Sequence, residues 1–228
     1  TLITYPVLLA VGISPVAANA TNTTGLSVGS WSSAWAYRRE LSGRRRTLLA
    51  MLVTTVLGAA MGAGLVLLLP ERVFALVVPW LILLAAAMVA LQPAIARWTG
   101  RHRFNSAPEG SPPIGLVAST TGTGLYGGYF GAAQGVVLMA VLGVLYDSDP
   151  QRANAAKNLL SAAANLTAAV VFIAAGRVWW PGAALLAVGA LVGGTLGARS
   201  ARRLPRRFLR ASVVVIGVIA ALSLWKVL

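Results

Sequence analysis

The sequence predicts an all-α integral membrane protein made of two inverted repeats of transmembrane helices, with Gly-rich broken or re-entrant hairpins. Three observations predict this class: an apolar composition, apolar stretches about as long as a membrane-spanning helix, and self-similarity at a shift of 135 residues. Of the 228 residues, 57% are hydrophobic and only 11% are charged, and the mean hydropathy is +0.77. These values lie well outside the usual range of soluble domains.

Apolar segments follow one another along the whole chain, and several approach the ~20 residues that an α-helix needs to cross the hydrocarbon core. They are 1–14, 17–37, 47–69, 74–96, 114–146, 151–175, 181–198 and 208–228. Segment 114–146 is interrupted by glycines, six of which lie between positions 122 and 135, a pattern that suits a hairpin. The chain opens on Thr1 in an apolar run without a preceding basic stretch, so no signal peptide is visible and we expect a trimmed start.

The internal repeat is defined by matched residues in one gapless register. The matches include Pro15 with Pro150, Asn19 with Asn154, Gly58 with Gly193, Gly62 with Gly197, and Pro70 with Pro205. Matches among Ala, Gly and Leu are expected by chance in this composition, whereas prolines and asparagines that recur in one register are not. We therefore divide a single membrane domain into a first repeat at 1–103 and a second at 114–228, joined by a basic linker at 97–113. Because the shift places 114–136 opposite positions before residue 1, we expect about twenty residues of the first repeat to be missing.

Orientation follows from the arginines, because cytoplasmic loops retain Lys and Arg. The loops assigned to the cytoplasm are 38–46, 97–103, 147–152 and 199–210. They hold 15 of the 17 arginines, and only Arg72 and Arg177 lie outside. This assignment requires segment 114–146 to enter and leave on the same side, as a re-entrant hairpin or as two short crossings. Pro15 and Pro150 then lie near opposite membrane faces, so the repeats are inverted, an arrangement that places a transporter's binding site near the midplane.

The net charge of +14 would suggest a nucleic-acid partner in a soluble protein. Here the arginines gather between apolar segments, so we expect them to touch anionic lipid, with the bilayer as partner and no nucleic acid. The chain has no cysteine, and its single histidine, His102, lies in a basic loop. We therefore expect no metal, no cofactor and no enzymatic activity.

Two unusually polar stripes follow the matched prolines. In the second repeat the stripe consists of Asn154, Lys157, Asn158, Ser161 and Asn165, at helical spacings of three to four residues. The equivalent positions of the first repeat are Asn19, Asn22, Thr23, Leu26 and Ser30. One pattern made twice suggests two stripes facing a shared axis, although such groups can also simply tie helices together.

A site for an anion needs hydrogen-bond donors and positive potential, and the stripes offer both. The helix N-termini after the two prolines expose N–H groups, and the amides and Lys157 add donors. An ionisable side chain in a membrane segment is a functional hypothesis by default, although Lys157 could also snorkel to the interface. All five acids lie in loops or at segment ends, which argues against a cation transporter and leaves the energy coupling open. In the glycine hairpin, Tyr126, Tyr129 and Gln134 are further donors.

From these patterns we predict a substrate-binding set and no catalytic or metal site. The predicted residues are Asn19, Asn22, Thr23, Tyr129, Gln134, Asn154, Lys157 and Asn158. The pattern fits a membrane transporter of a small anion. Two other classes stay open: a membrane scaffold subunit that transports nothing, and an embedded enzyme.

The motif SPVAANATN at 14–22 and the run GTGLYGGYFGAAQGVVL at 122–138 resemble the TauE/SafE sulfite-exporter family, also described as organosulfonate permeases. The resemblance covers nearly the whole chain. It implies a multi-pass carrier of sulfite, sulfoacetate or related anions in the bacterial cytoplasmic membrane. The family often has a small residue or Thr where this chain has Lys157 and Asn158, so the anion stays open, and a small carboxylate fits the donors equally well. Direction of transport, coupling ion and a homo-oligomeric state are left open too.

Overall fold

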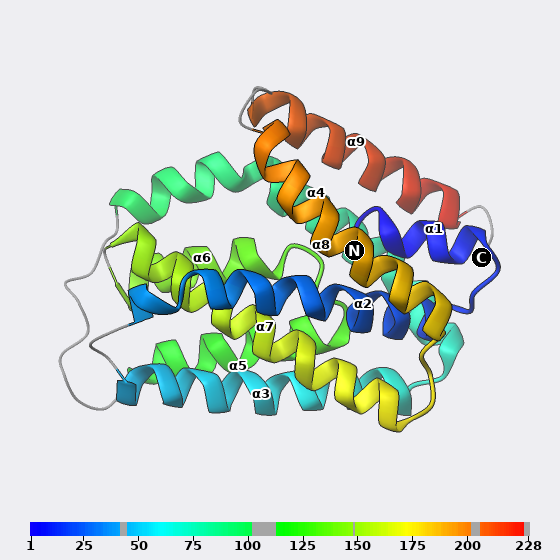
Figure 1. Ribbon diagram of the computed structural model, residues 1–228, viewed down its shortest axis with the longest axis horizontal. Helices are drawn as coiled ribbons and strands as arrows, with labels where there is room; N and C mark the ends of the chain where they lie inside the picture. The colour runs from blue at the N-terminus through cyan, green and yellow to red at the C-terminus, as the bar shows by residue number, and fades with distance from the viewer. Residues whose placement is uncertain (42–44, 102–112, 148, 202–205, 226–228) are drawn as a thin grey trace.

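The computed structural model is helical throughout the residues that it describes, which are 1–41, 45–101, 113–147, 149–201 and 206–225. His102, most of the linker predicted at 97–113, and the repeat match at Pro205 lie outside these ranges. The helices, shown in Figure 1, are α1 (Thr4–Ala10), α2 (Pro15–Ala36), η1 (Arg38–Leu41), α3 (Arg45–Leu68), α4 (Glu71–Arg101), α5 (Ile114–Tyr129), α6 (Gln134–Leu145), α7 (Pro150–Ala174), α8 (Trp180–Ala201) and α9 (Arg206–Trp225).

Proline and glycine set several of the helix ends. Pro15 and Pro150 are the first residues of α2 and α7, where the missing N–H of proline costs nothing and its fixed φ already suits a helix. Gly12 and Gly176 follow α1 and α7 with φ of 86° and 64°, the left-handed conformation that commonly stops a helix. The predicted apolar segment 1–14 therefore contains only a short helix before the chain turns into α2.

The helices repeat with the same spacing as the sequence. Helix α2 begins at residue 15 and α7 at residue 150, 135 residues later, and the described parts of α3 and α8 and of α4 and α9 correspond at the same shift. The second helix of each set, α3 or α8, follows its predecessor after a short connection. The 135-residue shift thus relates the positions of helices as well as the residue types.

Three helices are long and apolar enough to cross a membrane by length and composition: Arg45–Leu68, Glu71–Gly100 and Pro150–Ala174. Helix α3 also shows which of its faces such a membrane would meet. Leu49, Val53, Leu57 and Met61, spaced four residues apart, are each more than half exposed. An apolar ridge of this kind is stable against lipid and costly against water.

Helices α3 and α5 are in backbone contact along four glycines. A Cβ built on Gly58 would lie 2.3 Å from the carbonyl oxygen of Thr121, and one on Gly128 would lie 2.0 Å from that of Ala59. Gly62 and Gly124 are equally tight, at 2.1 and 2.4 Å from backbone oxygens. Gly58 and Gly62, four residues apart, thus form a small-residue packing pair of the kind that lets membrane helices approach closely. The matched Gly193 has no such neighbour within 4 Å among the described residues.

A second close contact joins α2 to α8. A Cβ on Gly25 would lie 2.6 Å from the Cβ of Leu186 and 2.8 Å from the carbonyl oxygen of Ala183, and one on Gly29 would lie 3.1 Å from the Cβ of Ala190. The backbone N–H of Trp179, just before α8, donates to Thr21 Oγ1 at 2.9 Å. Helix α8 is thereby fixed along much of α2.

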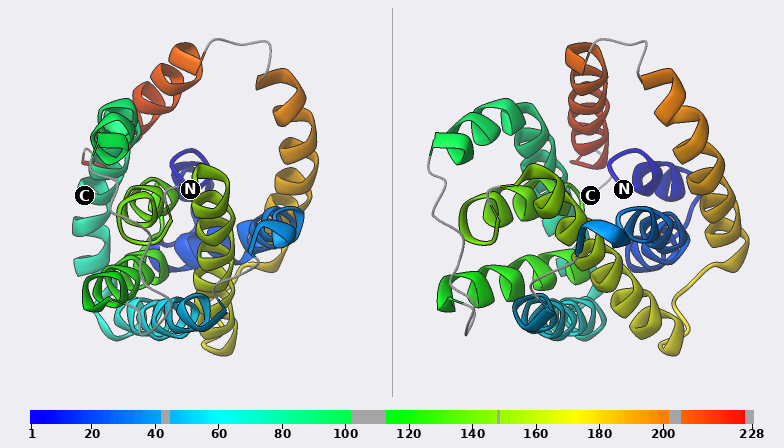
Figure 2. Two further views of the ribbon diagram at one scale, coloured as in Figure 1. Left: turned by 90° about the vertical axis from the view of Figure 1, so that its left-hand side faces the viewer. Right: turned by 60° about the vertical axis from the view of Figure 1, so that its left-hand side comes forward.

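Helix α7 packs between these two pairs, against α2 on one side and α3 on the other. It runs antiparallel to α2, because its Asn165 contacts Ser30 near the end of α2 whereas Trp179, after α7, contacts Thr21 near the beginning. On the far side of the molecule α9 lies against α4 (Figures 1 and 2). Helix α4 contains Pro79 and Pro93 and is visibly bent in Figure 2, as interior prolines require.

Segment 114–146 forms two helices, α5 and α6, separated by residues 130–133. Gly131 and Ala133 have φ of 70° and 59° in this turn, and the Tyr126 hydroxyl donates to the carbonyl oxygen of Ala132. The Gln134 side chain then donates back to the carbonyl oxygen of Thr123 at 3.1 Å, so α6 returns along α5.

Candidate functional site

A polar cavity of about 720 Å³ lies between α2, α7 and α8. Its polar lining residues are Ser30, Ser32, Ser33, Tyr37, Asn154, Lys157, Asn158 and Asn165. They share one origin: those of α7 lie three to four residues apart on one face, and those of α2 come from the last two turns of that helix. Because the helices are antiparallel, the beginning of α7 faces the end of α2 across the cavity.

Lys157 brings a positive charge into this cavity. Its side chain is partly buried, and its stem passes α6 at Gly135, where a Cβ would lie 3.6 Å from Lys157 Cδ. Both salt bridges found within the described residues belong to Arg152, at 3.8 Å from Asp147 and from Asp149, and no Asp or Glu is among the residues that line the cavity. The charge is therefore compensated by no carboxylate in the described part of the chain.

Ser30 and Asn165 connect the two helices inside the cavity. Asn165 Nδ2 donates to Ser30 Oγ at 2.8 Å, and the two residues are counterparts in the 135-residue register. This bond holds α2 and α7 at a fixed separation where both line the space. Neither residue was in the predicted binding set, although both belong to the polar stripes from which that set was drawn.

The apolar lining of the cavity includes Leu26 of α2 and Ala190 and Leu191 of α8. The serines and Tyr37 supply hydroxyls that both donate and accept, the asparagines supply amide donors, and Lys157 supplies charge. Such a lining can hold an anionic head group with several oxygens and place a short apolar portion against α8. Ser32, Ser33 and Tyr37 were missed by the sequence analysis because the register of α2 against α7 is not readable from either helix alone.

The predicted residues of the first repeat lie elsewhere, at the other end of α2. Asn22 Nδ2 donates to Thr1 Oγ1 at 3.0 Å, and its Oδ1 accepts from the Thr4 hydroxyl. Asn19 and Thr23 are buried as well, and Asn19 Nδ2 donates to the carbonyl oxygen of Tyr129 at 3.0 Å. These contacts connect α2 to α1 and to the turn after α5, and none of the three residues is among those lining the cavity.

The two predicted residues of the glycine hairpin are packed into the protein. The Tyr129 ring contacts Phe74, with ring centroids 5.5 Å apart. Gln134 is only 3% exposed and lies so close to Gly127 that a Cβ there would be 2.3 Å from Gln134 Nε2. The structure thus brings Asn154, Lys157 and Asn158 together in the cavity and places Tyr129 and Gln134 on either side of the turn between α5 and α6.

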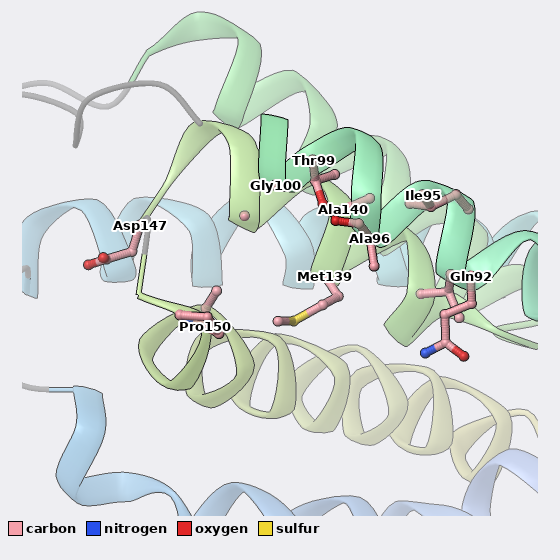
Figure 3. Close-up of a pocket in the computed structure, with 12 residues that line it drawn as sticks. Gln92, Ile95, Ala96, Thr99, Gly100, Met139, Ala140, Asp147 and Pro150 are labelled. Atoms are coloured by element: carbon pink, nitrogen blue, oxygen red, sulfur yellow. Dashed lines mark hydrogen bonds between the residues drawn. The ribbon is translucent and has the colours of Figure 1, made fainter. Parts of the chain in front are cut away.

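A second, smaller cavity of about 230 Å³ lies between α4, α6 and the beginning of α7 (Figure 3). Its lining is largely apolar, with Met139 beside the polar side chains of Gln92, Thr99 and Asp147. Asp147 is buried, and its Oδ1 accepts from the backbone N–H of Asp149 at 2.9 Å. No Lys or Arg is among its lining residues in the described part of the chain, so it lacks the donor set and the charge that the larger cavity offers to an anion.

Comparison with known proteins agrees with a membrane function. The sequence pattern of the family described as sulfite exporter TauE/SafE matches residues 1–224. The chain is 27% identical over 224 residues to the probable membrane transporter protein YfcA of Escherichia coli K12, covering 98% of this chain and 81% of that protein. It is 25% identical over 214 residues to a probable membrane transporter protein of Haemophilus influenzae, covering 94% and 82%.

A third relative, the probable membrane transporter protein ORF9 of Sinorhizobium sp, is 26% identical over 223 residues, which is 98% of this chain and 83% of that protein. No solved structure matches the chain. The match to the family pattern extends over both polar stripes, the glycine run and the helices that enclose the cavity. The chain therefore belongs to the sulfite exporter TauE/SafE family of membrane transporters.

Proposed function

We propose that this protein carries small sulfur-containing anions, such as sulfite or organosulfonates, across a bacterial cytoplasmic membrane, and that the cavity between α2, α7 and α8 binds them. The observation that carries the proposal is the lining itself: Lys157 and several amide and hydroxyl donors, with no carboxylate among the lining residues. One positive charge without a carboxylate partner favours an anion over a cation.

The number of donors favours an anion with three oxygens on one centre. Asn154, Asn158 and Asn165 line the same space as the Lys157 ammonium group, which can donate three hydrogen bonds itself. A sulfite or sulfonate head group accepts from more of these donors than a carboxylate, which has two oxygens. Charge-assisted hydrogen bonds of this kind are roughly twice as strong as neutral ones.

The size and the apolar wall of the cavity favour an anion with a short organic tail. A volume of about 720 Å³ exceeds the needs of one bare sulfite ion. It lies within the ~300–1,000 Å³ that is usual for sites of small organic ligands. With its head group at Lys157, a short alkanesulfonate could rest its carbon chain against Leu26 and Leu191. Sulfite would occupy the same donors together with water.

Inverted repeats would explain how such a cavity serves both membrane faces. Support comes from the 135-residue spacing between the starts of α2 and α7, the antiparallel course of these two helices, and the Ser30–Asn165 contact. A residue touches its own repeat counterpart where a pseudo-twofold axis passes between them. We place this axis in the membrane plane, with the α5–α6 hairpin re-entrant and the chain crossing the membrane several times.

In this arrangement the cavity opens toward the cytoplasm. It is bounded by Tyr37 at the end of α2 and by Asn154 near the beginning of α7, next to the loops at 38–46 and 147–152 to which we assigned the cytoplasmic side. At the other end, α2 is closed against its neighbours by the Asn19 and Asn22 hydrogen bonds. Transport would open those contacts and close the cytoplasmic ones.

The proposal is tested by measuring which anions the purified protein exchanges. Proteoliposomes preloaded with sulfite, sulfate, thiosulfate, sulfoacetate, methanesulfonate, acetate or succinate are assayed for counterflow of labelled sulfite, with protein-free vesicles as the control. We expect sulfite and the sulfonates to drive exchange and the carboxylates to drive little. Exchange driven equally by acetate or succinate would assign the site to carboxylates, and no exchange with any anion would contradict a carrier of this class.

A further inference from the structure

The strongest unexplained feature of the interior is one buried oxygen atom. Asn19 is 0% exposed, and its Nδ2 donates to the carbonyl oxygen of Tyr129 at 3.0 Å. Its Oδ1 has no hydrogen-bond partner among the described residues. A buried acceptor without a partner is destabilising, and native proteins retain such atoms mainly where something binds them.

The surroundings of this oxygen are rich in acceptors. Because the Asn19 amide is bound to the Tyr129 carbonyl, its oxygen lies beside the C-terminal end of α5, where the last carbonyl groups of the helix lack intrahelical partners. The aligned peptide dipoles also make this end partially negative. The N–H groups of Phe130 and Gly131 are both used, since each donates to the carbonyl oxygen of Tyr126.

The charged groups nearby also favour a cation, because a carboxylate offsets the positive end of α2. The N-terminus of α2, one turn from Asn19, would carry a partial positive charge. Its Val16 N–H donates to Glu71 Oε1 at 3.1 Å, so a carboxylate already offsets that charge. Tyr129 and Phe130 belong to an apolar cluster with Tyr5 and Phe74, which lowers the local dielectric and strengthens any ion–oxygen attraction.

Comparison with the other repeat shows why the two ends of the protein differ. The counterpart of Asn19 is Asn154, which lines the anion cavity, and the counterpart of Asn22 is Lys157. One end of the α2–α7 pair therefore offers donors and a positive charge. The other end has an amide, Asn22, where the lysine would be, and offers the unpaired oxygen of Asn19.

We propose that Asn19 Oδ1 and the carbonyl oxygens at the C-terminal end of α5, including that of Tyr129, bind a monovalent cation of the Na⁺ type. In transporters, unwound backbone carbonyls and the C-terminal ends of broken helices coordinate such ions. The ion would be held between α2 and the turn that leads into α6. Its role as the coupling ion, which balances the charge of the carried anion, rests on the proposed function; its binding does not.

The test measures cation binding in the absence of any transported anion. The apparent unfolding temperature of the full chain in detergent is recorded against NaCl, with N-methylglucamine chloride holding ionic strength and chloride constant. A ligand that binds only the folded state raises this temperature in a saturable way, so we expect Na⁺-specific stabilisation of the parent. No difference between Na⁺ and N-methylglucamine would mean that Asn19 Oδ1 merely binds water, and would overturn the proposal.

Two substitutions at Asn19 and one at its counterpart complete the design. Asn19→Leu, which keeps the side-chain size, should raise the half-saturating Na⁺ concentration by about tenfold or more, because one coordinating oxygen is lost. Asn19→Asp keeps that oxygen and adds a negative charge, so it should lower the half-saturating concentration. An unchanged value in Asn19→Asp overturns the assignment, even if Asn19→Leu does not fold.

Asn154→Leu is the matched control, since it makes the same change at the equivalent position of the other repeat. It should keep the parental Na⁺ response while losing stabilisation by methanesulfonate. Loss of the Na⁺ response in Asn154→Leu as well would contradict a separate cation site. If the parent responds to Na⁺ but to no anion, the cation site is supported and only the proposed substrate fails.

Discussion

Replacing Lys157 with Met removes the charge of the cavity and little else. The Met side chain follows the lysine stem past Gly135, where a Cβ would lie 3.6 Å from Lys157 Cδ, so packing against α6 is retained. At about 4 Å, two unit charges attract by ~4 kcal/mol at an effective dielectric near 20. Desolvation offsets part of this, which leaves ~1.5–3 kcal/mol for a charge-assisted hydrogen bond. The apparent affinity for sulfite should therefore fall by roughly 10- to 150-fold.

The assay is initial-rate uptake of labelled sulfite into proteoliposomes at several concentrations, at equal protein content. Arg177→Gln is the matched control: it removes one positive charge from an exposed position between α7 and α8, and it should leave affinity within about twofold of the parent. Lys157→Met should also unfold at no lower temperature than the parent, because a partly buried charge without a carboxylate partner costs stability. Unchanged sulfite affinity in Lys157→Met would refute the reasoning and show that the lysine only reaches toward the membrane interface.

Two further predictions concern packing and topology. Gly128→Ala places a Cβ 2.0 Å from the Ala59 carbonyl oxygen and should destabilise the protein by about 1–3 kcal/mol, whereas Gly64→Ala, with open space around it, should stabilise by up to about 1 kcal/mol; thermal unfolding in detergent compares them, and equal effects would contradict the α3–α5 contact. Single cysteines can be placed cleanly because the chain has none: in intact cells an impermeant maleimide should label position 177 but not 39, and the reverse pattern would invert the proposed orientation.

Much of the fold could be predicted because it is encoded locally. The length and composition of the apolar segments predicted the long helices, and the prolines at 15 and 150 marked the starts of α2 and α7 to within two residues of the predicted segments 17–37 and 151–175. The gapless repeat implied corresponding helices, and the starts of α2 and α7 do lie 135 residues apart. These signals can all be read from the order of residue types along the chain, without knowing which helices pack together.

The site could be predicted only in part because it depends on how α2 and α7 are registered. The stripe on α7 correctly gathers Asn154, Lys157 and Asn158 on one face, as helical spacing requires. The same spacing cannot say that Asn19 lies against Tyr129, 110 residues away, or that Ser33 and not Thr23 shares the cavity with the lysine. Such contacts depend on how α2 and α7 pack against their neighbours in antiparallel orientation, and the residues of neither helix carry a local signal for that packing.

The glycine contacts bear on how a carrier of this kind can change shape. Helices whose backbones touch cannot slide past each other by fractions of a turn, because every residue along the seam would collide with a carbonyl oxygen. The α3–α5 pair and the α2–α8 pair should therefore each behave as one stiff body. Helix α7 packs along both bodies without a glycine of its own, and Ser30–Asn165 is the only side-chain hydrogen bond found between α7 and α2 in the described residues. Relative movement of the two bodies should therefore occur most easily at the contacts of α7, so substitutions there should alter the rate of transport. Substitutions in the glycine contacts should instead alter whether the protein folds and assembles.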